Sequence, residues 1–291
     1  MDFLQAVFIG IVHGITVFLP VSSSGHTSLI GNLWNINGAQ GLFFEVLLHV
    51  AALFAVLIAF WKDVTKIAAE IILICMDVIT NIRIFIENKK SGADKRYQKI
   101  SGTNYRKLTL LMIVAAVPMA MIGFLSRNLV QIAFGSLLAT AVGTMISVIL
   151  LLVMDYIAKG DKIPKDMTYD NAIWLGICQG ISVFPGVSRT CICLSVCLLC
   201  GLNRKVAVKF TFLMSIPAIC GALILELGNL GGFQMTGRLF GSYVCGALAA
   251  GITGFFLIRH LAKYLLKARF RGFAAYSFLL GAAAIACNFL K

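Results

Sequence analysis

The sequence predicts an all-α integral membrane protein, an inverted repeat in which each half has one re-entrant helical hairpin and three transmembrane helices. Three observations support this fold class. Of the 291 residues, 59% are hydrophobic and only 13% are charged, which is far more apolar than a soluble domain. Six apolar stretches reach the length of about 20 residues that a membrane-spanning helix needs. Two further apolar stretches are broken by Pro, Gly and Ser in a similar pattern.

The first apolar stretch, 4–33, has its polar break in the middle and is therefore expected to form a hairpin of two helices. Irregular backbone is tolerated at membrane depth only where protein or a wet cavity surrounds it. The other predicted elements, in chain order, are spans near 42–61, 108–127 and 133–157, a second hairpin at 172–201, and spans near 206–228, 239–258 and 272–290. They form one membrane domain over 1–291, with repeat one at 1–157 and repeat two at 172–291.

Segment 66–88 is apolar but carries five charged side chains, which are Lys66, Glu70, Asp77, Arg83 and Glu87. Such a mixture is typical of an amphipathic helix that lies on the membrane surface. We expect such a helix here, or an extension of the basic loop 88–107, and a membrane crossing is the less favoured alternative.

The basic residues predict the orientation. If span 42–61 runs inward, 21 of the 25 Lys and Arg residues fall in cytoplasmic segments, namely 62–107, 158–170, 202–209 and 259–271. Arg127, Arg238 and Lys291 fall on the opposite side, and Arg189 stays within the membrane. This asymmetry follows the positive-inside rule and places both chain ends outside the cytoplasm. The net charge of +13 therefore reports topology, and no nucleic-acid partner is expected.

Nine cysteines are scattered over the apolar segments, with Cys193, Cys197 and Cys200 on one helical face. That spacing admits a metal site, but small apolar residues that pack between helices explain it better. No disulfide framework is predicted.

An internal repeat relates the two broken stretches. Residues 10–18 align without a gap onto 176–184, with six identities and a Thr16/Ser182 exchange, and a Pro and a Ser follow in both copies. The same offset of 166 residues carries span 42–61 onto 208–227. Three spans in each half reverse the second copy, so the hairpins enter from opposite faces. Interrupted helices that meet near the midplane in this way build a binding site in many transporters.

The chemistry of the breaks indicates an anion site. The first break reads Pro20-Val-Ser-Ser-Ser-Gly-His26, and Ser22 or Ser23 is suited to cap the following helix. The second reads Pro185-Gly-Val-Ser-Arg-Thr190. Helix N-termini and an arginine fork both bind phosphate or carboxylate groups. Because an arginine within the membrane is costly, Arg189 is expected to be functional, although an ion pair with Glu45 is an alternative.

These motifs resemble the undecaprenyl-diphosphate phosphatase (bacitracin-resistance) family. The residues that carry the resemblance are Phe18-Leu-Pro-Val-Ser-Ser-Ser-Gly-His26, Phe44-Glu-Val46, Val117-Pro118, Phe184-Pro-Gly-Val-Ser-Arg189 and Phe210-Thr-Phe-Leu-Met-Ser-Ile-Pro217, in order through nearly the whole chain. The resemblance implies a multi-pass protein of the bacterial plasma membrane with inverted repeats and two re-entrant hairpins. It further implies removal of the terminal phosphate from undecaprenyl diphosphate on the outer side, helped by a divalent cation such as Mg²⁺ or Ca²⁺. The product is the lipid carrier of cell-wall synthesis.

By the same resemblance, Ser23 matches the proposed nucleophile of the family and His26 its essential histidine, while Ser22, Ser188 and Arg189 match its phosphate-contacting residues. We therefore expect Ser23, His26 and Arg189 to be catalytic. The substrate-binding set is completed by residues of the same two breaks, which are Ser24, Gly186 and Thr190.

The chain departs from the family pattern at two glutamates. The family reads Glu-Gly-x-Thr-Glu-Phe-Leu-Pro before the serines, whereas this chain reads His13-Gly-Ile-Thr-Val17-Phe-Leu-Pro, and Thr190-Cys-Ile-Cys193 replaces Ser-Gly-x-Thr. Hard cations prefer oxygen ligands. His13 and Glu45 are the remaining candidate metal ligands, with His13 poorly suited to Mg²⁺ or Ca²⁺.

Two functions are therefore compared. The favoured one is a polyprenyl-diphosphate phosphatase, with a polyprenyl diphosphate lipid and the bilayer as its partners and a homodimer as one candidate assembly. The alternative is a non-catalytic lipid-phosphate or anion transporter, or flippase, on the same inverted-repeat scaffold.

Overall fold

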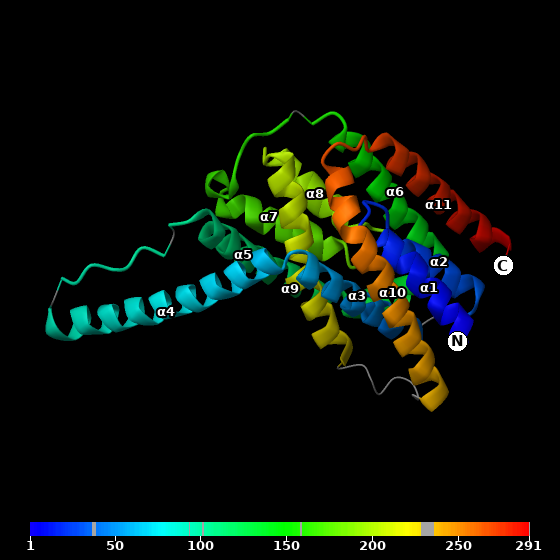
Figure 1. Cartoon of the computed structure of the whole chain (residues 1–291), viewed down its shortest axis with the longest axis horizontal. Coiled ribbons are helices and arrows are strands. Elements are labelled where there is room, and N and C mark those ends of the chain that lie inside the picture. The colour runs from blue at the N-terminus through cyan, green and yellow to red at the C-terminus, as the bar shows by residue number, and fades with distance from the viewer. Residues whose placement is uncertain (37–38, 93, 101, 158, 228–235, 291) are drawn as a thin grey trace.

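The described residues of this computed structural model, 1–36, 39–92, 94–100, 102–157, 159–227 and 236–290, form eleven α-helices and one short 3-10 helix at Pro164–Asp166 (Figure 1). The α-helices are α1 Phe3–Thr16, α2 Ser23–Leu33, α3 Ala39–Ala59, α4 Trp61–Ser91, α5 Asn104–Phe134, α6 Leu137–Met154, α7 Tyr169–Ile181, α8 Arg189–Leu199, α9 Arg204–Leu227, α10 Gly237–Leu265 and α11 Arg271–Leu290. Lys291, the end of the predicted span 206–228 and parts of the predicted loop 88–107 lie outside the described residues.

Six helices of the described chain are long and apolar enough to cross a membrane, namely α3, α5, α6, α9, α10 and α11. Each of them contains most of one predicted span, so the expectation of six spans is confirmed by length and composition. Helices α5 and α10 extend furthest beyond the predicted bounds, because helical hydrogen bonds continue into ends that carry polar residues such as Asn128 and His260. The protein is thus an all-α, multi-pass membrane protein.

Each half also contains the predicted helix, break and helix. Helices α1 and α2 in the first half have their counterparts, shifted by 166 residues, in α7 and α8. The capping agrees as well, because Ser22 Oγ accepts a hydrogen bond from the N–H of Gly25 at 2.9 Å and Ser188 Oγ accepts one from Cys191 at 3.2 Å. This correspondence supports the predicted duplication. That each pair enters and leaves by one membrane face stays a prediction.

The two halves are interleaved. Helix α1 packs along α10 of the other half, and α7 packs along α5, while α6 and α11 lie side by side (Figure 1). Both hairpin contacts use a glycine at equivalent positions. A Cβ atom on Gly10 would lie 2.1 Å from the backbone oxygen of Gly246, and one on Gly176 would lie 2.2 Å from that of Ala115. Missing side chains therefore let the backbones approach, as is usual between membrane helices.

Helix α4 projects from the helical body, and a returning segment that includes residues 94–100 runs alongside it (Figure 1). It is not among the helices of the described residues that are long and apolar enough to span. That it lies on the membrane surface stays a prediction. The polar side of α4 is covered by the chain that follows it. Arg106 at the start of α5 contacts Asp77, and Asn81 exchanges hydrogen bonds with Gln98 of the returning segment. The opposite side exposes a stripe of isoleucines, Ile72, Ile79 and Ile86.

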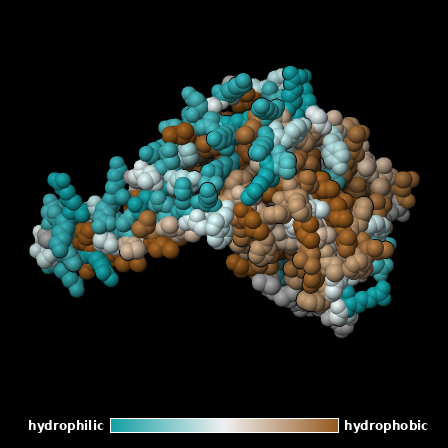
Figure 2. All heavy atoms as spheres, in the orientation of Figure 1, coloured by the Kyte–Doolittle hydropathy of each residue, from teal (hydrophilic) through white to brown (hydrophobic). Residues whose placement is uncertain are grey.

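The surface of the body is strongly divided. Figure 2 shows hydrophobic side chains over the face formed by α1 and α10, and hydrophilic ones gathered along the upper edge and on α4. Exposed residues on α1 and α10 include Leu4, Phe8, Ile252 and Phe256. Such a broad apolar face is stable only in lipid.

Candidate functional site

The two breaks meet inside the protein. Thr190 Oγ1 on α8 donates a hydrogen bond to the backbone oxygen of Val17 in the first break at 3.2 Å. A Cβ atom on Gly25 would lie 3.2 Å from Gly186 Cα of the second break. The tips of the two hairpins are therefore in direct contact, as the repeat predicts.

Helix α6 supports both breaks. Ser147 Oγ accepts a hydrogen bond from the N–H of Ser188 at 2.8 Å and donates to the oxygen of Gly186 at 3.1 Å. Thr140 Oγ1 lies 2.8 Å from Ser28 Oγ on α2. Gly186 has φ +86°, and a Cβ there would lie 2.1 Å from Thr140 O. Position 186 therefore accepts only glycine, because any side chain there would overlap the backbone of α6.

A cavity of about 490 Å³ lies at the junction of the breaks. One end is polar and is lined by predicted site residues, which are Ser23, Ser24, Glu45, Ser188, Arg189 and Thr190. The remaining wall comes largely from apolar side chains of α5 and α9, including Met119, Phe124, Ile219 and Ile224. Phe124 and Ile224 are also exposed on the outer surface of the body. The cavity is therefore amphipathic, and its apolar part reaches the lipid-facing side.

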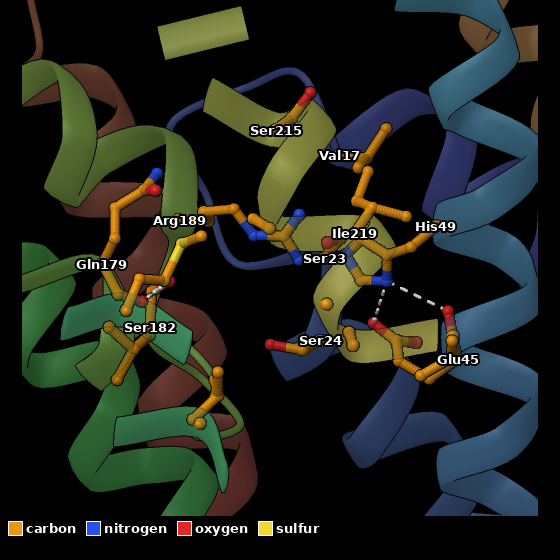
Figure 3. A pocket seen from close by; sticks show the side chains of 18 of the residues that line it. Val17, Ser23, Ser24, Glu45, His49, Gln179, Ser182, Arg189, Ser215 and Ile219 are labelled. Carbon is orange, nitrogen blue, oxygen red and sulfur yellow. Dashed lines mark hydrogen bonds and ion pairs between the residues drawn. The ribbon is translucent and has the colours of Figure 1, made fainter. Parts of the chain in front are cut away.

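Arg189 is the cation of the polar end. Figure 3 shows its side chain extending into the cavity toward Ser23. The alternative of an ion pair with Glu45 is not observed, because the carboxylate's close partners are His13 and His49, and no carboxylate of the described residues lies within ion-pair distance of Arg189. The guanidinium is therefore available to an anionic ligand.

Glu45 sits between two histidines. Its Oε2 lies 3.6 Å from His13 Nδ1 and its Oε1 lies 3.5 Å from His49 Nδ1, and the rings of the two histidines are 4.4 Å apart between centroids. All three side chains are buried, and their ligand atoms lie within 4.8 Å of one another. The structure thus brings together the predicted candidates His13 and Glu45 and adds His49, which lines the cavity (Figure 3).

His26 takes a different position from that expected of a partner of Ser23. It is not part of the cavity wall. Its Nδ1 lies 2.6 Å from the backbone oxygen of Ser22, and its Nε2 lies 2.7 Å from Tyr276 Oη on α11. A carbonyl only accepts, so Nδ1 carries the proton and Nε2 accepts from the tyrosine. Both ring nitrogens are occupied, and the catalytic role of His26 stays a prediction.

Two other predicted residues, Ser22 and Gly186, do not line the cavity but stabilise the backbone around it. Ser22 caps α2 and its Oγ lies 3.1 Å from Ser24 Oγ, while Gly186 packs on α6. The cysteines are free thiols, and Cys191, Cys193 and Cys197 are buried in the apolar core, as expected of packing residues.

Sequence reasoning missed His49 and Tyr276. His49 follows Glu45 by four residues and so lies on the same face of α3, a signal that could have been used. Tyr276 is 250 residues away from His26, and no local pattern links them.

Comparison with known proteins gives the family. The model of the family described as "Bacitracin resistance protein BacA" matches residues 6–283. A protein of Alkaliphilus metalliredigens named "Undecaprenyl-diphosphatase" is 33% identical, with all of both chains covered. Proteins of the same name are 30% identical in Methanosphaera stadtmanae, over 97% of this chain and 96% of the other, and 33% identical in Clostridium perfringens strain 13, over 96% and 93%. Because both the family match and these relatives extend over nearly its whole length, the chain belongs to the bacitracin resistance protein BacA family.

Proposed function

We propose that this protein hydrolyses undecaprenyl diphosphate, or a related polyprenyl diphosphate, in the cell membrane and releases the terminal phosphate. One observation carries the proposal: Arg189, Ser23 and the first residues of α2 and α8 line one cavity, and the rest of its wall is largely apolar, with Arg127 and Glu226 as charged exceptions. Membership of the family and the name of the relatives, undecaprenyl-diphosphatase, support it.

The cavity suits an amphipathic substrate. Backbone N–H groups at the start of α2 and α8 and the Arg189 fork are donors for a diphosphate. The apolar side chains of α5 and α9 then contact the first part of the prenyl chain, and the rest of the chain lies in the bilayer. Pockets with a few convergent polar groups in an apolar wall are typical ligand sites.

In the proposed reaction, Ser23 Oγ forms a bond to the terminal phosphorus while the bond from that phosphorus to the bridging oxygen breaks. Polyprenyl phosphate leaves, the hydroxyl proton passes to a base, and water then releases inorganic phosphate from the serine. Arg189 and the helix N-termini stabilise charge on the phosphoryl oxygens. If the base is His26, its hydrogen bond from Tyr276 must first open, because Nε2 is the nitrogen that can accept a proton.

The divalent cation implied by the resemblance is a separate question. Two imidazoles and one carboxylate form the buried ligand group, and such a set fits Mg²⁺ or Ca²⁺ poorly because both prefer oxygen. No step of the proposed reaction is assigned to the ion.

The test is phosphate release from farnesyl diphosphate by purified protein, with and without added Mg²⁺, Ca²⁺, Mn²⁺ or Zn²⁺. We expect Arg189→Ala to lose at least about 10³-fold in kcat/KM, in line with the arginine contribution to phosphoryl transfer. The matched control is Arg238→Ala, because Arg238 is exposed and pairs with Asp2 at the protein surface.

The alternative function is a non-catalytic carrier. The observation that supports it is the replacement of the family's two glutamates by His13 and Val17. No phosphate release with any metal, together with binding of the diphosphate that depends on Arg189, would establish the carrier instead. A His13→Glu, Val17→Glu variant that gains hydrolysis absent from the parent would identify a disabled phosphatase.

A further inference from the structure

Glu45 is a buried carboxylate whose ion-pair partners are two histidines. Both of its oxygens are fully buried and have no hydrogen-bond partner, and neither ring nitrogen of His13 has one. The distances of 3.5 and 3.6 Å to the two histidines are longer than hydrogen bonds. A buried carboxylate of this kind is strongly unfavourable unless a cation compensates it.

The tautomer of His49 leaves a lone pair available. Its Nδ1 lies 3.0 Å from the backbone oxygen of Glu45, which only accepts, so Nδ1 carries the proton and donates. The lone pair is then on Nε2. Histidines that ligate metals usually donate their other ring N–H to a carbonyl or carboxylate in this way.

We propose that His13, Glu45 and His49 bind a divalent first-row transition-metal ion, with Zn²⁺ as the first candidate, and not Mg²⁺ or Ca²⁺. Two imidazole nitrogens and one carboxylate oxygen are ligands that suit such metals. Three protein ligands leave a coordination position open, and Glu45 and His49 both line the cavity. The ion therefore has access to a ligand in the cavity. Its catalytic use rests on the proposed function, whereas its binding does not.

The second half of the protein provides an internal comparison. The repeat offset of 166 residues places Gln179, Thr211 and Ser215 opposite His13, Glu45 and His49, and all three line the same cavity. None of the three is a metal ligand of the imidazole or carboxylate type. The metal site is thus confined to the first half, and His13→Gln introduces the residue that the second half already accommodates at the equivalent place.

The experiment measures bound metal and not activity. Protein purified with a tag that contains no histidine is stripped with chelator, equilibrated separately with Zn²⁺, Mn²⁺, Mg²⁺ and Ca²⁺, and analysed for metal per chain. We expect about one tightly bound Zn²⁺ per chain and no comparable binding of Mg²⁺ or Ca²⁺. His13→Gln and His49→Gln should each weaken Zn²⁺ affinity at least about tenfold.

Two control variants separate the site from other ligands. His260→Gln removes an exposed histidine on α10 and Cys197→Ser removes a buried thiol, and both should keep the bound Zn²⁺. Unchanged affinity in His13→Gln and His49→Gln, or loss of the ion only in Cys197→Ser, would overturn the proposal.

X-ray absorption at the zinc edge of the unmodified protein keeps the proposal testable if a variant fails to fold. Imidazole and oxygen ligands without sulfur are the expected result, and a sulfur-bound or all-oxygen ion would contradict it. The two proposals can fail separately. Zinc bound by the three residues without hydrolysis contradicts only the phosphatase, and hydrolysis supported by Mg²⁺ in a protein that binds no Zn²⁺ contradicts only the metal assignment.

Discussion

At the scale of single residues, the contact between His26 and Tyr276 decides how the serine could be activated. The tyrosine hydroxyl occupies the one ring nitrogen of His26 that can take up a proton. The two rings are also stacked, with centroids 5.6 Å apart. The histidine is therefore held in place by α11, and it is not among the residues that line the cavity.

We expect His26→Ala to lower phosphate release by about 10²-fold, the usual contribution of a general base, with a smaller effect on binding of the diphosphate. Tyr276→Phe should retain at least the turnover of the unmodified protein, because it frees Nε2 while the stacked ring remains. The loss of one hydrogen bond should lower stability by about 1 kcal/mol. Steady-state kinetics and thermal unfolding in detergent measure both effects. A Tyr276→Phe protein as inactive as His26→Ala would show that the tyrosine itself takes part in the reaction.

At the scale of elements, the second break depends on Gly186. It combines a left-handed backbone, φ +86°, with the close approach of Thr140 O on α6. Gly92, at the end of α4, also has positive φ, +64°, but nothing lies within 4 Å of a Cβ built there. An alanine at position 92 therefore introduces backbone strain alone, whereas an alanine at position 186 introduces both backbone strain and steric overlap.

Gly92→Ala should cost about 1 kcal/mol of unfolding free energy, from backbone strain alone. Gly186→Ala should cost about 3 kcal/mol or more, since the backbone of α6 must also move, and it should abolish activity by displacing Arg189. The midpoints of thermal unfolding of the two variants provide the comparison. Equal midpoints would mean that the break adapts to a side chain and does not position Arg189 rigidly.

Helix α4 has two unlike faces, and only the polar one is covered by protein. Asp77 contacts Arg106 of α5 and Asn81 contacts the returning segment, while Ile79 lies on the other side and is exposed. An apolar stripe of this kind beside a basic loop is expected to lie in the lipid headgroup region.

Ile79→Trp, in a background where Trp34, Trp61 and Trp174 are replaced by Phe, should show fluorescence that lipids with brominated acyl chains quench. The control is Tyr97→Trp in the same background, because Tyr97 belongs to the exposed returning segment and should be quenched much less. Equal quenching at both positions would exclude a surface helix with its isoleucines in the membrane.

At the scale of the whole molecule, the sequence was most informative where one local property determines the structure. Hydropathy located the six spans, and Pro, Gly and Ser located the breaks. The helices of the two hairpins begin at the repeat offset of 166 residues, and they end at that offset to within one residue. These features depend on the hydropathy of one segment or on the backbone preferences of its own residues, and so they can be predicted from a single sequence.

Features that depend on packing between distant segments were not predictable. The approach of α1 to α10 follows from the meeting of Gly10 and Gly246, and no pattern within either helix specifies it. The same holds for His26, whose ring could face Ser23 or α11 from the same position on α2. The meeting of His13 on α1 with Glu45 on α3 is likewise a contact between distant segments, whereas His49 could have been found from its spacing to Glu45 on one helix.

The membrane orientation of the whole molecule is the last prediction, because it determines on which side the site could open. The distribution of basic residues predicts that α4 lies on the cytoplasmic side and that both chain ends lie outside the cytoplasm. In a variant without native cysteines, Lys90→Cys at the end of α4 should resist a membrane-impermeant maleimide in intact cells and react once the cells are opened. Asp2→Cys, beside the exposed start of α1, should react in intact cells. The opposite labelling pattern would mean that the orientation is inverted. Labelling of both positions in intact cells would mean that the chain crosses the membrane an even number of times between them.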